Sequence, residues 1–312
     1  MGSQRRQEQS ADSAKSVPES ATIVMDSSRL WRQNRYIYPV LARRTGGVSI
    51  GVNLNVDKIC NFGCIYCEVN RRVTPLIKDV DLEALTTELR AALEMAQNGE
   101  LLRDARFAGL AAPDGGTLRV TDIAFSGDGE PTSFRNFKAV VERTIALRNT
   151  AGLPNVKIVV ITNASLFHRP QVREALTLVH EAGGEVWAKL DAGTAEYFKL
   201  IDDTTIPYER ILRNIRDLGS RFPLVIQSCF MRVHGVGPSD EEIAAYIGRL
   251  RAFRAEGAQI KLVQVYSVSR PPTESSVTAL PPADLESIRS RIETALGDIP
   301  VRRFDGTWTG AA

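Results

Sequence analysis

Three of the four cysteines in this chain, Cys60, Cys64 and Cys67, lie in the short segment CNFGCIYC. Thiolates this close together are suited to soft metals, namely zinc, copper(I) or the iron of an iron–sulfur cluster. A structural zinc site needs four ligands, and no pair of Cys or His follows at the spacing of zinc sites. Iron–sulfur clusters are usually held by four cysteines, so three thiolates suit a [4Fe–4S] cluster with one open iron. The fourth cysteine, Cys229, is predicted to be a buried strand residue.

The cysteine segment directly follows a predicted strand, and downstream of it apolar runs alternate with helix-like segments. This alternation is typical of parallel strands joined by right-handed helical crossovers. Six such units are two short of a closed eight-fold barrel. We therefore expect an α/β fold that forms an open, partial (β/α)6 barrel, with its site at the carboxyl ends of the strands. The predicted strands are 48–56, 118–125, 156–162, 185–191, 224–233 and 259–268, and the predicted helices are 81–97, 136–148, 171–183, 208–218, 239–253 and 282–296.

The chain divides into four predicted regions: a disordered polar tail at 1–28, an N-terminal extension at 29–47, the core barrel at 48–300 and a C-terminal tail at 301–312. Basic and aromatic residues are interleaved within 29–44, which could contact RNA or another anion. The alternative is a strap whose aromatic side chains pack on the barrel. We favour the strap because the basic segment is short for phosphate binding.

Overall composition excludes several classes of protein. The 39 basic and 37 acidic residues leave a net charge of +2, so a strongly basic nucleic-acid binder is not indicated, although nucleic acid stays possible. No apolar run approaches the ~18 residues of a membrane span, and the N-terminus has no apolar signal core. Few cysteines and no signal favour a reducing compartment. We therefore expect a cytoplasmic protein without a membrane partner.

The arrangement Cys-x3-Cys-x2-Cys after the first strand of such a chain, with Tyr66 directly before the last cysteine, resembles the radical S-adenosylmethionine (SAM) superfamily. The resemblance covers about residues 48–270. It implies that SAM chelates the open iron through its amino and carboxylate groups, and that Tyr66 lies in the SAM site. The pairing of CNFGCIYCE with SGDGEPT is similar to stand-alone iron–sulfur oxidoreductases that are compared with wyosine-base synthases of tRNA. Those synthases bind a second cluster through N-terminal cysteines, which this chain lacks, so tRNA-base synthesis is not expected.

The resemblance also implies SAM contacts in the turn after the second predicted strand. Gly127, Asp128, Gly129 and Glu130 match the glycine-rich, acid-ending motif that holds the methionine amine of SAM in the family. Glycines let the backbone approach a ligand closely, and a carboxylate accepts a charge-assisted hydrogen bond from an ammonium. The alternative is an ordinary turn before a helix, for which these residue types are common.

Later strand ends supply the remaining expected contacts. Asn163 ends the third predicted strand, where relatives approach SAM or substrate, although an Asn in a turn is equally ordinary. Lys189 and Asp191 share one face of the fourth strand. By resemblance, Asp191 binds the ribose hydroxyls and Lys189 the carboxylate of SAM; the alternative is an ion pair at the strand end. Arg270, after the sixth strand, is a candidate substrate anchor.

We therefore expect a radical SAM enzyme in which a [4Fe–4S] cluster, reduced by an external low-potential electron donor, cleaves SAM to a 5′-deoxyadenosyl radical that abstracts hydrogen from an unidentified substrate. One alternative is an enzyme that installs a glycyl radical on a partner protein. Another is an RNA-modifying enzyme that uses the 29–44 segment. A non-enzymatic alternative is an iron–sulfur or zinc-binding protein that does not respond to SAM.

Overall fold

The computed structural model describes residues 34–42, 44–69, 77–104, 106–112 and 115–304. The predicted 1–28 tail and residues 29–33 of the basic segment lie outside these ranges. The main strands are β1 (Ile37–Ala42), β2 (Gly47–Val52), β3 (Val120–Phe125), β4 (Lys157–Thr162), β5 (Glu185–Lys189), β6 (Leu224–Cys229), β8 (Ile260–Tyr266) and β10 (Val301–Phe304). The helices are α2 (Leu82–Gln97), α3 (Phe137–Thr150), α4 (Pro170–Glu181), α5 (Ala195–Asp202), α6 (Tyr208–Gly219), α7 (Asp240–Ala255) and α8 (Pro282–Leu296), with short 3-10 turns η2 (Leu101–Arg103) and η3 (Pro131–Ser133).

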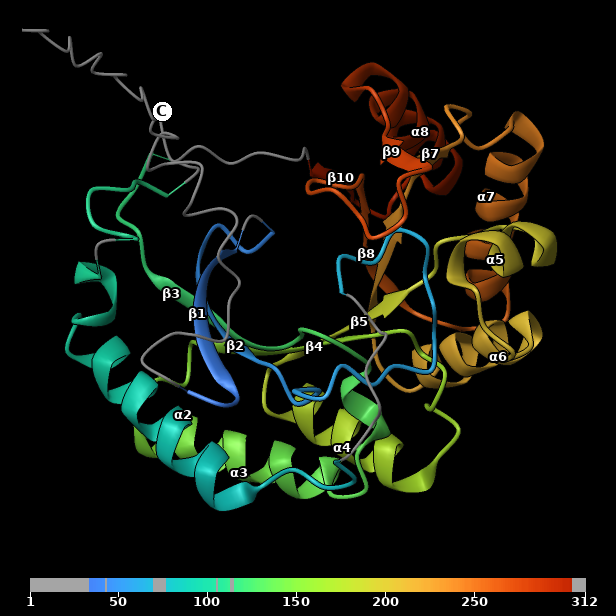
Figure 1. Cartoon of the computed structure of the whole chain (residues 1–312). Coiled ribbons are helices and arrows are strands. Elements are labelled where there is room, and N and C mark those ends of the chain that lie inside the picture. The colour runs from blue at the N-terminus through green and yellow to red at the C-terminus, as the bar shows by residue number, and fades with distance from the viewer. Residues whose placement is uncertain (1–33, 43, 70–76, 105, 113–114, 305–312) are drawn as a thin grey trace, which may run out of the picture.

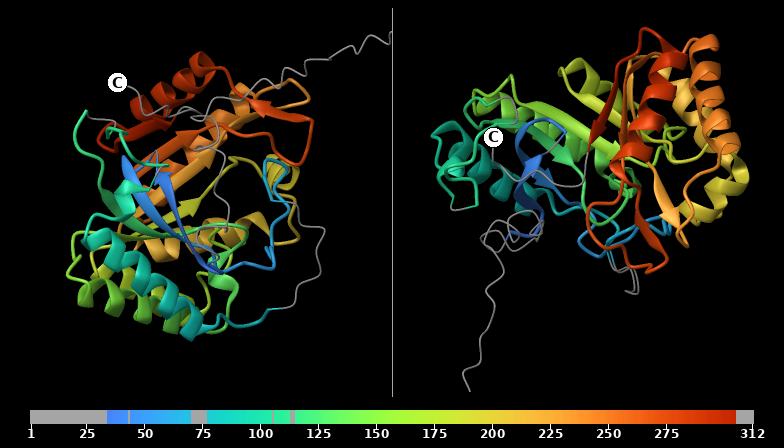
Figure 2. Two further views of the ribbon diagram at one scale, coloured as in Figure 1. Left: turned by 60° about the vertical axis from the view of Figure 1, so that its left-hand side comes forward. Right: turned by 90° about the horizontal axis from the view of Figure 1, so that it is seen from above.

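These eight strands form one sheet in the order β1-β2-β3-β4-β5-β6-β8-β10. The six strands from β2 to β8 are parallel neighbours in chain order. The sheet curls strongly, and the helices that link its strands cover its convex face (Figure 1; Figure 2). The edge strands β1 and β10 are not paired with each other in this order. The predicted open, partial (β/α)6 barrel is therefore confirmed.

The two faces of the sheet carry different residues because side chains alternate along a strand. In β3, Ile123 and Phe125 belong to the large apolar core, whereas Ala124 belongs to a separate small cluster with Val159 and Trp187. Polar side chains are also buried within strands, among them Asp122, Ser49, Gln227 and Gln264. Gln227 donates to Gln264 at 3.1 Å across β6 and β8. The concave face of the barrel is thus considerably more polar than the helix-covered face.

The N-terminal extension contributes an edge strand. β1 pairs antiparallel with β2, with Ile37 opposite Val52. Tyr36 and Tyr38 are buried, so in its described part the segment packs on the barrel, as the strap interpretation predicts. No helix in the described ranges is long and apolar enough to cross a membrane.

Three sequence predictions need correction. Residues 301–304, predicted to belong to a tail, form β10, which pairs in parallel with β8 and buries Val301 against the core. Four residues are too few to show a strand period, so only their long-range pairing reveals them. The predicted strand 224–233 ends at Cys229, and Met231–Val233 forms β7, which pairs with β9 (Val277–Ala279) in a small second sheet. Helix α5 was not predicted. Residues 305–312 lie outside the described ranges.

Candidate functional site

The three clustered cysteines lie in the loop after β2, residues 53–69, which we call the cysteine loop. All three are partly exposed, and none of the four cysteines forms a disulfide. The loop docks on the end of α5: the amide of Ile65 donates to the carbonyl of Ile201 at 2.9 Å. The ring of Phe62 also packs edge-on against Phe198, with 5.8 Å between centroids. Helix α5 therefore fixes the position of the cysteines.

Within this loop, Cys64 contacts a buried acid. Its Sγ donates to Oδ1 of Asp202 at 3.4 Å. Burial and then the neighbouring Asp202 raise the pKa of the Cys64 thiol well above its ordinary value. A metal that coordinates Cys64 would deprotonate this thiol.

The donor set fits an iron–sulfur cluster better than a single ion. In the described ranges, no group of three or more His, Cys, Asp or Glu side chains is arranged to hold one metal ion. A structural zinc ion needs its ligands to converge on one point. Each cysteine of a [4Fe–4S] cluster binds a different iron, so its sulfurs surround a larger body and do not have to converge. Three thiols on one loop satisfy this second requirement.

The glycine-rich turn, residues 126–130, is joined to the cysteine loop by close contacts. Asn53 and Asp128 exchange two hydrogen bonds, at 2.9 and 3.1 Å. Gly127 has φ 143°, a backbone conformation that favours glycine. A Cβ on Gly129 would lie 1.8 Å from the carbonyl oxygen of Ile59, beside Cys60. The glycines therefore allow the turn to approach the cysteine-bearing backbone.

Glu130, predicted to bind the amine of SAM, is enclosed by protein donors. Its Oε1 accepts hydrogen bonds from Thr162 Oγ1 at 2.7 Å and from both the amide, at 3.1 Å, and the hydroxyl of Thr132. Its Oε2 accepts from the amide of Asn163 at 2.8 Å. Burial raises the pKa of Glu130, while these bonds favour its charged form. In this arrangement the carboxylate ties β3 to β4, and its contact with SAM stays a prediction.

Asn163 lies beside the first cysteine. Its Nδ2 donates to Oδ1 of Asn61 at 2.7 Å and lies 4.0 Å from Sγ of Cys60. Its Oδ1 accepts from the hydroxyl of Ser165 at 2.6 Å. The structure thus brings Asn163 to the cysteine loop, as predicted for a residue of this site.

Tyr66, Lys189 and Asp191 form one hydrogen-bonded group. The hydroxyl of Tyr66 donates to Oδ2 of Asp191 at 2.6 Å, and Lys189 Nζ lies 3.3 Å from the same oxygen. Lys189 also donates to the hydroxyl of Tyr266 at 2.5 Å. Burial acts to lower the pKa of Lys189, but Asp191 beside it raises that pKa overall. The ion pair expected as the alternative is therefore present, and it lies next to the cysteine loop.

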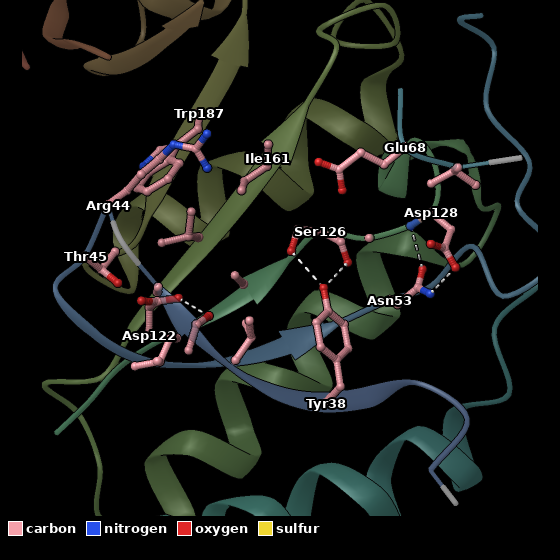
Figure 3. Close-up of a pocket in the computed structure, with 18 of the residues that line it drawn as sticks. Tyr38, Arg44, Thr45, Asn53, Glu68, Asp122, Ser126, Asp128, Ile161 and Trp187 are labelled. Carbon is pink, nitrogen blue, oxygen red and sulfur yellow. Dashed lines mark hydrogen bonds between the residues drawn. The ribbon is translucent and has the colours of Figure 1, made fainter. Parts of the chain in front are cut away.

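A cavity of about 290 Å³ opens on the concave side of the sheet, with lining residues from β1 to β5 and from the cysteine loop. Figure 3 shows its labelled residues in two groups. At the loop end are Asn53, Glu68 and Asp128, with Arg270, whose Nε lies 2.8 Å from Oε2 of Glu68. The other end, which we call the Arg44 end, is lined by Arg44, Ser49, Asp122 and Trp187.

The sequence places Arg44 in the basic 29–44 segment that could contact an anion, but Ser49, Asp122 and Trp187 were not predicted as site residues. A signal was available, because Ser49 and Asp122 are polar positions inside otherwise apolar strands. Both are buried, with 3% and 2% exposure. Buried polar residues at inward positions of a partial barrel are candidates for ligand contacts, since they need partners.

The chain is similar to several known proteins. It is 22% identical over 267 residues to GTPase Obg of Brachyspira hyodysenteriae, covering 84% of this chain and 34% of that protein. It is 25% identical over 228 residues to a UPF0026 protein of Helicobacter pylori, covering 70% of this chain and 63% of that protein. The chain therefore spans less than two thirds of the length of either relative.

Two solved structures share the fold. SuiB of Streptococcus suis, bound to S-adenosylmethionine, has a TM-score of 0.54 at 13% identity, covering 84% of this chain and 52% of that chain. TYW1 with a lysine–pyruvate adduct has a TM-score of 0.50 at 14% identity, covering 89% and 82%. A family model, the radical SAM superfamily, matches residues 54–250. That match contains the three clustered cysteines, the glycine-rich turn and the strands from β3 to β6. This protein therefore belongs to the radical SAM superfamily.

Proposed function

We propose that Cys60, Cys64 and Cys67 hold a [4Fe–4S] cluster whose open iron binds SAM. With the cluster reduced by an external low-potential donor, SAM is cleaved to a 5′-deoxyadenosyl radical that takes a hydrogen atom from a substrate. The observation that carries this proposal is the position of three cysteines on one docked loop. Glu68 and Val69, which follow Cys67 in this loop, line the cavity of the barrel.

The residues around the cysteine loop position SAM in this proposal. The glycine-rich turn offers backbone close to Cys60, because Gly129 has no Cβ to obstruct the approach. Asp191 is fixed by Tyr66 and by the amide of Cys229 at 2.7 Å, so its carboxylate has a defined orientation for ribose hydroxyls. Lys189 supplies a partly buried positive charge for the carboxylate of SAM. Fixed partners of this kind lower the reorganisation that a bound ligand requires.

The first test is anaerobic. The protein is reconstituted with iron and sulfide, mixed with SAM and dithionite, and assayed for 5′-deoxyadenosine by mass spectrometry. Cys64→Ala should lose the cluster and the product. Cys229→Ala is the matched control, because Cys229 is a β6 residue whose contact with Asp191 is made by its backbone amide, which alanine keeps, and it should retain both. Product formation by Cys64→Ala equal to that of the wild type would refute the assignment.

The non-enzymatic alternative is separated by spectroscopy. A SAM-binding cluster changes its EPR spectrum when SAM is added, because SAM becomes a ligand of one iron. A metal site that does not respond to SAM would predict an unchanged spectrum. An unchanged spectrum together with no 5′-deoxyadenosine would favour this alternative.

A further inference from the structure

The Arg44 end of the cavity contains a cation that the protein leaves partly unsatisfied. The guanidinium of Arg44 lies over the ring of Tyr266, 4.3 Å from its centroid. Its Nε is buried and has no hydrogen-bond partner among the described residues. The protein therefore does not fully compensate this guanidinium. Arg44 is partly exposed and lines the cavity, so its guanidinium can meet an anionic group of a ligand there.

A buried acid lines the same cavity. Asp122 is 2% exposed and accepts hydrogen bonds from the hydroxyls of Ser49 at 2.5 Å and Thr121 at 2.8 Å. Its pKa is raised by burial. Within the described ranges, its hydrogen-bond partners are hydroxyls and no basic side chain, Arg44 included, forms an ion pair with it. A carboxylate can accept further hydrogen bonds beyond these.

An acid and a guanidinium that line one cavity without pairing are complementary to a molecule that carries both charges. We propose that this end of the cavity binds an α-amino acid, with its carboxylate on Arg44 and its ammonium on Asp122, as the substrate of the site. The role of this amino acid as a substrate rests on the proposed function, whereas its binding at the Arg44 end does not. Charge-assisted hydrogen bonds on both sides would orient the amino acid in the barrel.

The walls between the two ends select the side chain of that amino acid. Ala124, Val159, Ile161 and the ring of Trp187 line the cavity. Figure 3 shows Ile161 between Arg44 and the loop-end residue Glu68. A volume of about 290 Å³ is at the small end for ligand pockets. An amino acid with an apolar side chain fits this lining, with the side chain directed from Arg44 toward the loop end.

The test measures binding to the reconstituted protein by titration calorimetry. S-adenosylhomocysteine is present at saturation, so that the probes do not occupy the SAM site. The probes are L-leucine and L-phenylalanine. Each is compared with its analogue without the amino group (4-methylpentanoate, 3-phenylpropanoate) and without the carboxylate (3-methylbutylamine, 2-phenylethylamine). At least one amino acid should bind about tenfold more tightly than either of its analogues, because each analogue lacks one charge-assisted contact.

Variants assign the two contacts. Arg44→Met should bind the amino acid no better than the amine, and Asp122→Asn should bind it no better than the acid. Arg291→Gln is the matched control, because Arg291 pairs with Asp240 on the exposed surface at 2.6 Å, and it should bind like the wild type. The comparison of ligands on the wild-type protein stands even where a variant does not fold.

The outcomes separate this inference from the proposed function. Equal binding of an amino acid and its acid or amine analogue, or no binding of either amino acid, overturns the inference. Formation of 5′-deoxyadenosine by the same protein without any amino acid would then leave the radical SAM assignment intact. Selective amino-acid binding without 5′-deoxyadenosine in any mixture would support the inference and refute the proposed function.

Discussion

At the loop end of the cavity the protein satisfies its own polar groups, whereas at the Arg44 end it does not. Arg270 pairs with Glu68 at 2.8 Å, and Asn53 and Asp128 exchange two hydrogen bonds. At the other end, the Nε of Arg44 is buried without a partner. A cofactor site binds better when the protein already holds its polar groups in place. A substrate site can keep polar groups whose interactions are completed only when the substrate binds. The difference therefore indicates which end serves which ligand.

Gly129→Ala should produce the largest effect, because it breaks the frame at the loop end. The added Cβ would lie 1.8 Å from the carbonyl oxygen of Ile59 and 2.7 Å from the side chain of Asn55. Backbone cannot yield as a flexible side chain can, so we expect a loss of at least about 3 kcal/mol in the free energy of unfolding. Urea denaturation measures the loss, and iron content after reconstitution should fall with it.

The same substitution at Gly248 is the control. Gly248 lies in α7 and an added Cβ would meet nothing within 4 Å. Gly248→Ala should therefore stabilise the protein by about 0.5–1 kcal/mol through lower backbone entropy in the unfolded chain. Equal stability of the two variants would show that the glycine-rich turn does not require a residue without a Cβ at position 129.

Glu130→Gln should have the next largest effect, about 2 kcal/mol of lost stability. An amide places an NH₂ group where the carboxylate accepts from Thr132, Thr162 or Asn163, so donors would face donors. Thermal and urea unfolding measure the loss. If Glu130→Gln left the stability unchanged and weakened only SAM binding, Glu130 would have the role predicted from the sequence.

Glu185→Gln tests whether Glu185 holds Trp187 in the cavity wall, and its effect on stability should depend on pH. Glu185 accepts from Trp187 Nε1 at 3.0 Å and pairs with Lys157 and Lys261. Burial acts to raise the pKa of Glu185, but hydrogen bonds from the two lysines lower it from 4.5 to about 2. The charged form therefore stabilises the fold fully above pH 4.5, and this contribution is lost as the pH falls toward 2.

Because the two lysines are half exposed, we expect Glu185→Gln to cost only about 1.5 kcal/mol at pH 7. The difference from the wild type should narrow as urea unfolding is repeated at pH values below 4.5. A difference that stays constant down to pH 3 would mean that the pKa of Glu185 is not lowered by its partners.

Most of the barrel follows from local sequence pattern, whereas its edges do not. The predicted helix 282–296 matches α8, and the predicted strand 156–162 differs from β4 by one residue. Their apolar periods are long enough to be read locally. β10 depends on pairing with β8, which lies far from it along the chain, whereas β1 pairs with the adjacent β2. With four and six residues, neither strand carries a clear period. Helix α5 was not predicted, because its 8 residues are too few to show a clear helical period.

The candidate site divides in the same way. The cysteines and the glycine-rich turn are visible because their spacing is local in the chain, and the structure places them in contact. Three features depend instead on contacts between segments that lie apart in the chain: the enclosure of Glu130, the docking of Ile65 on α5, and the stacking of Arg44 on Tyr266. No pattern within one segment encodes such contacts.

Arg44→Met should have the smallest effect on stability, within about 1 kcal/mol. The variant loses the interaction with the ring of Tyr266, but it also removes a buried donor that has no partner. A substrate-binding group is expected to contribute little to the fold, since natural sites accept such groups for function. With L-leucine or L-phenylalanine present, the wild-type protein should gain thermal stability through binding and the variant should not. A loss as large as that of Glu130→Gln, with no ligand effect in either protein, would make Arg44 a structural residue and remove the difference between the two ends of the cavity.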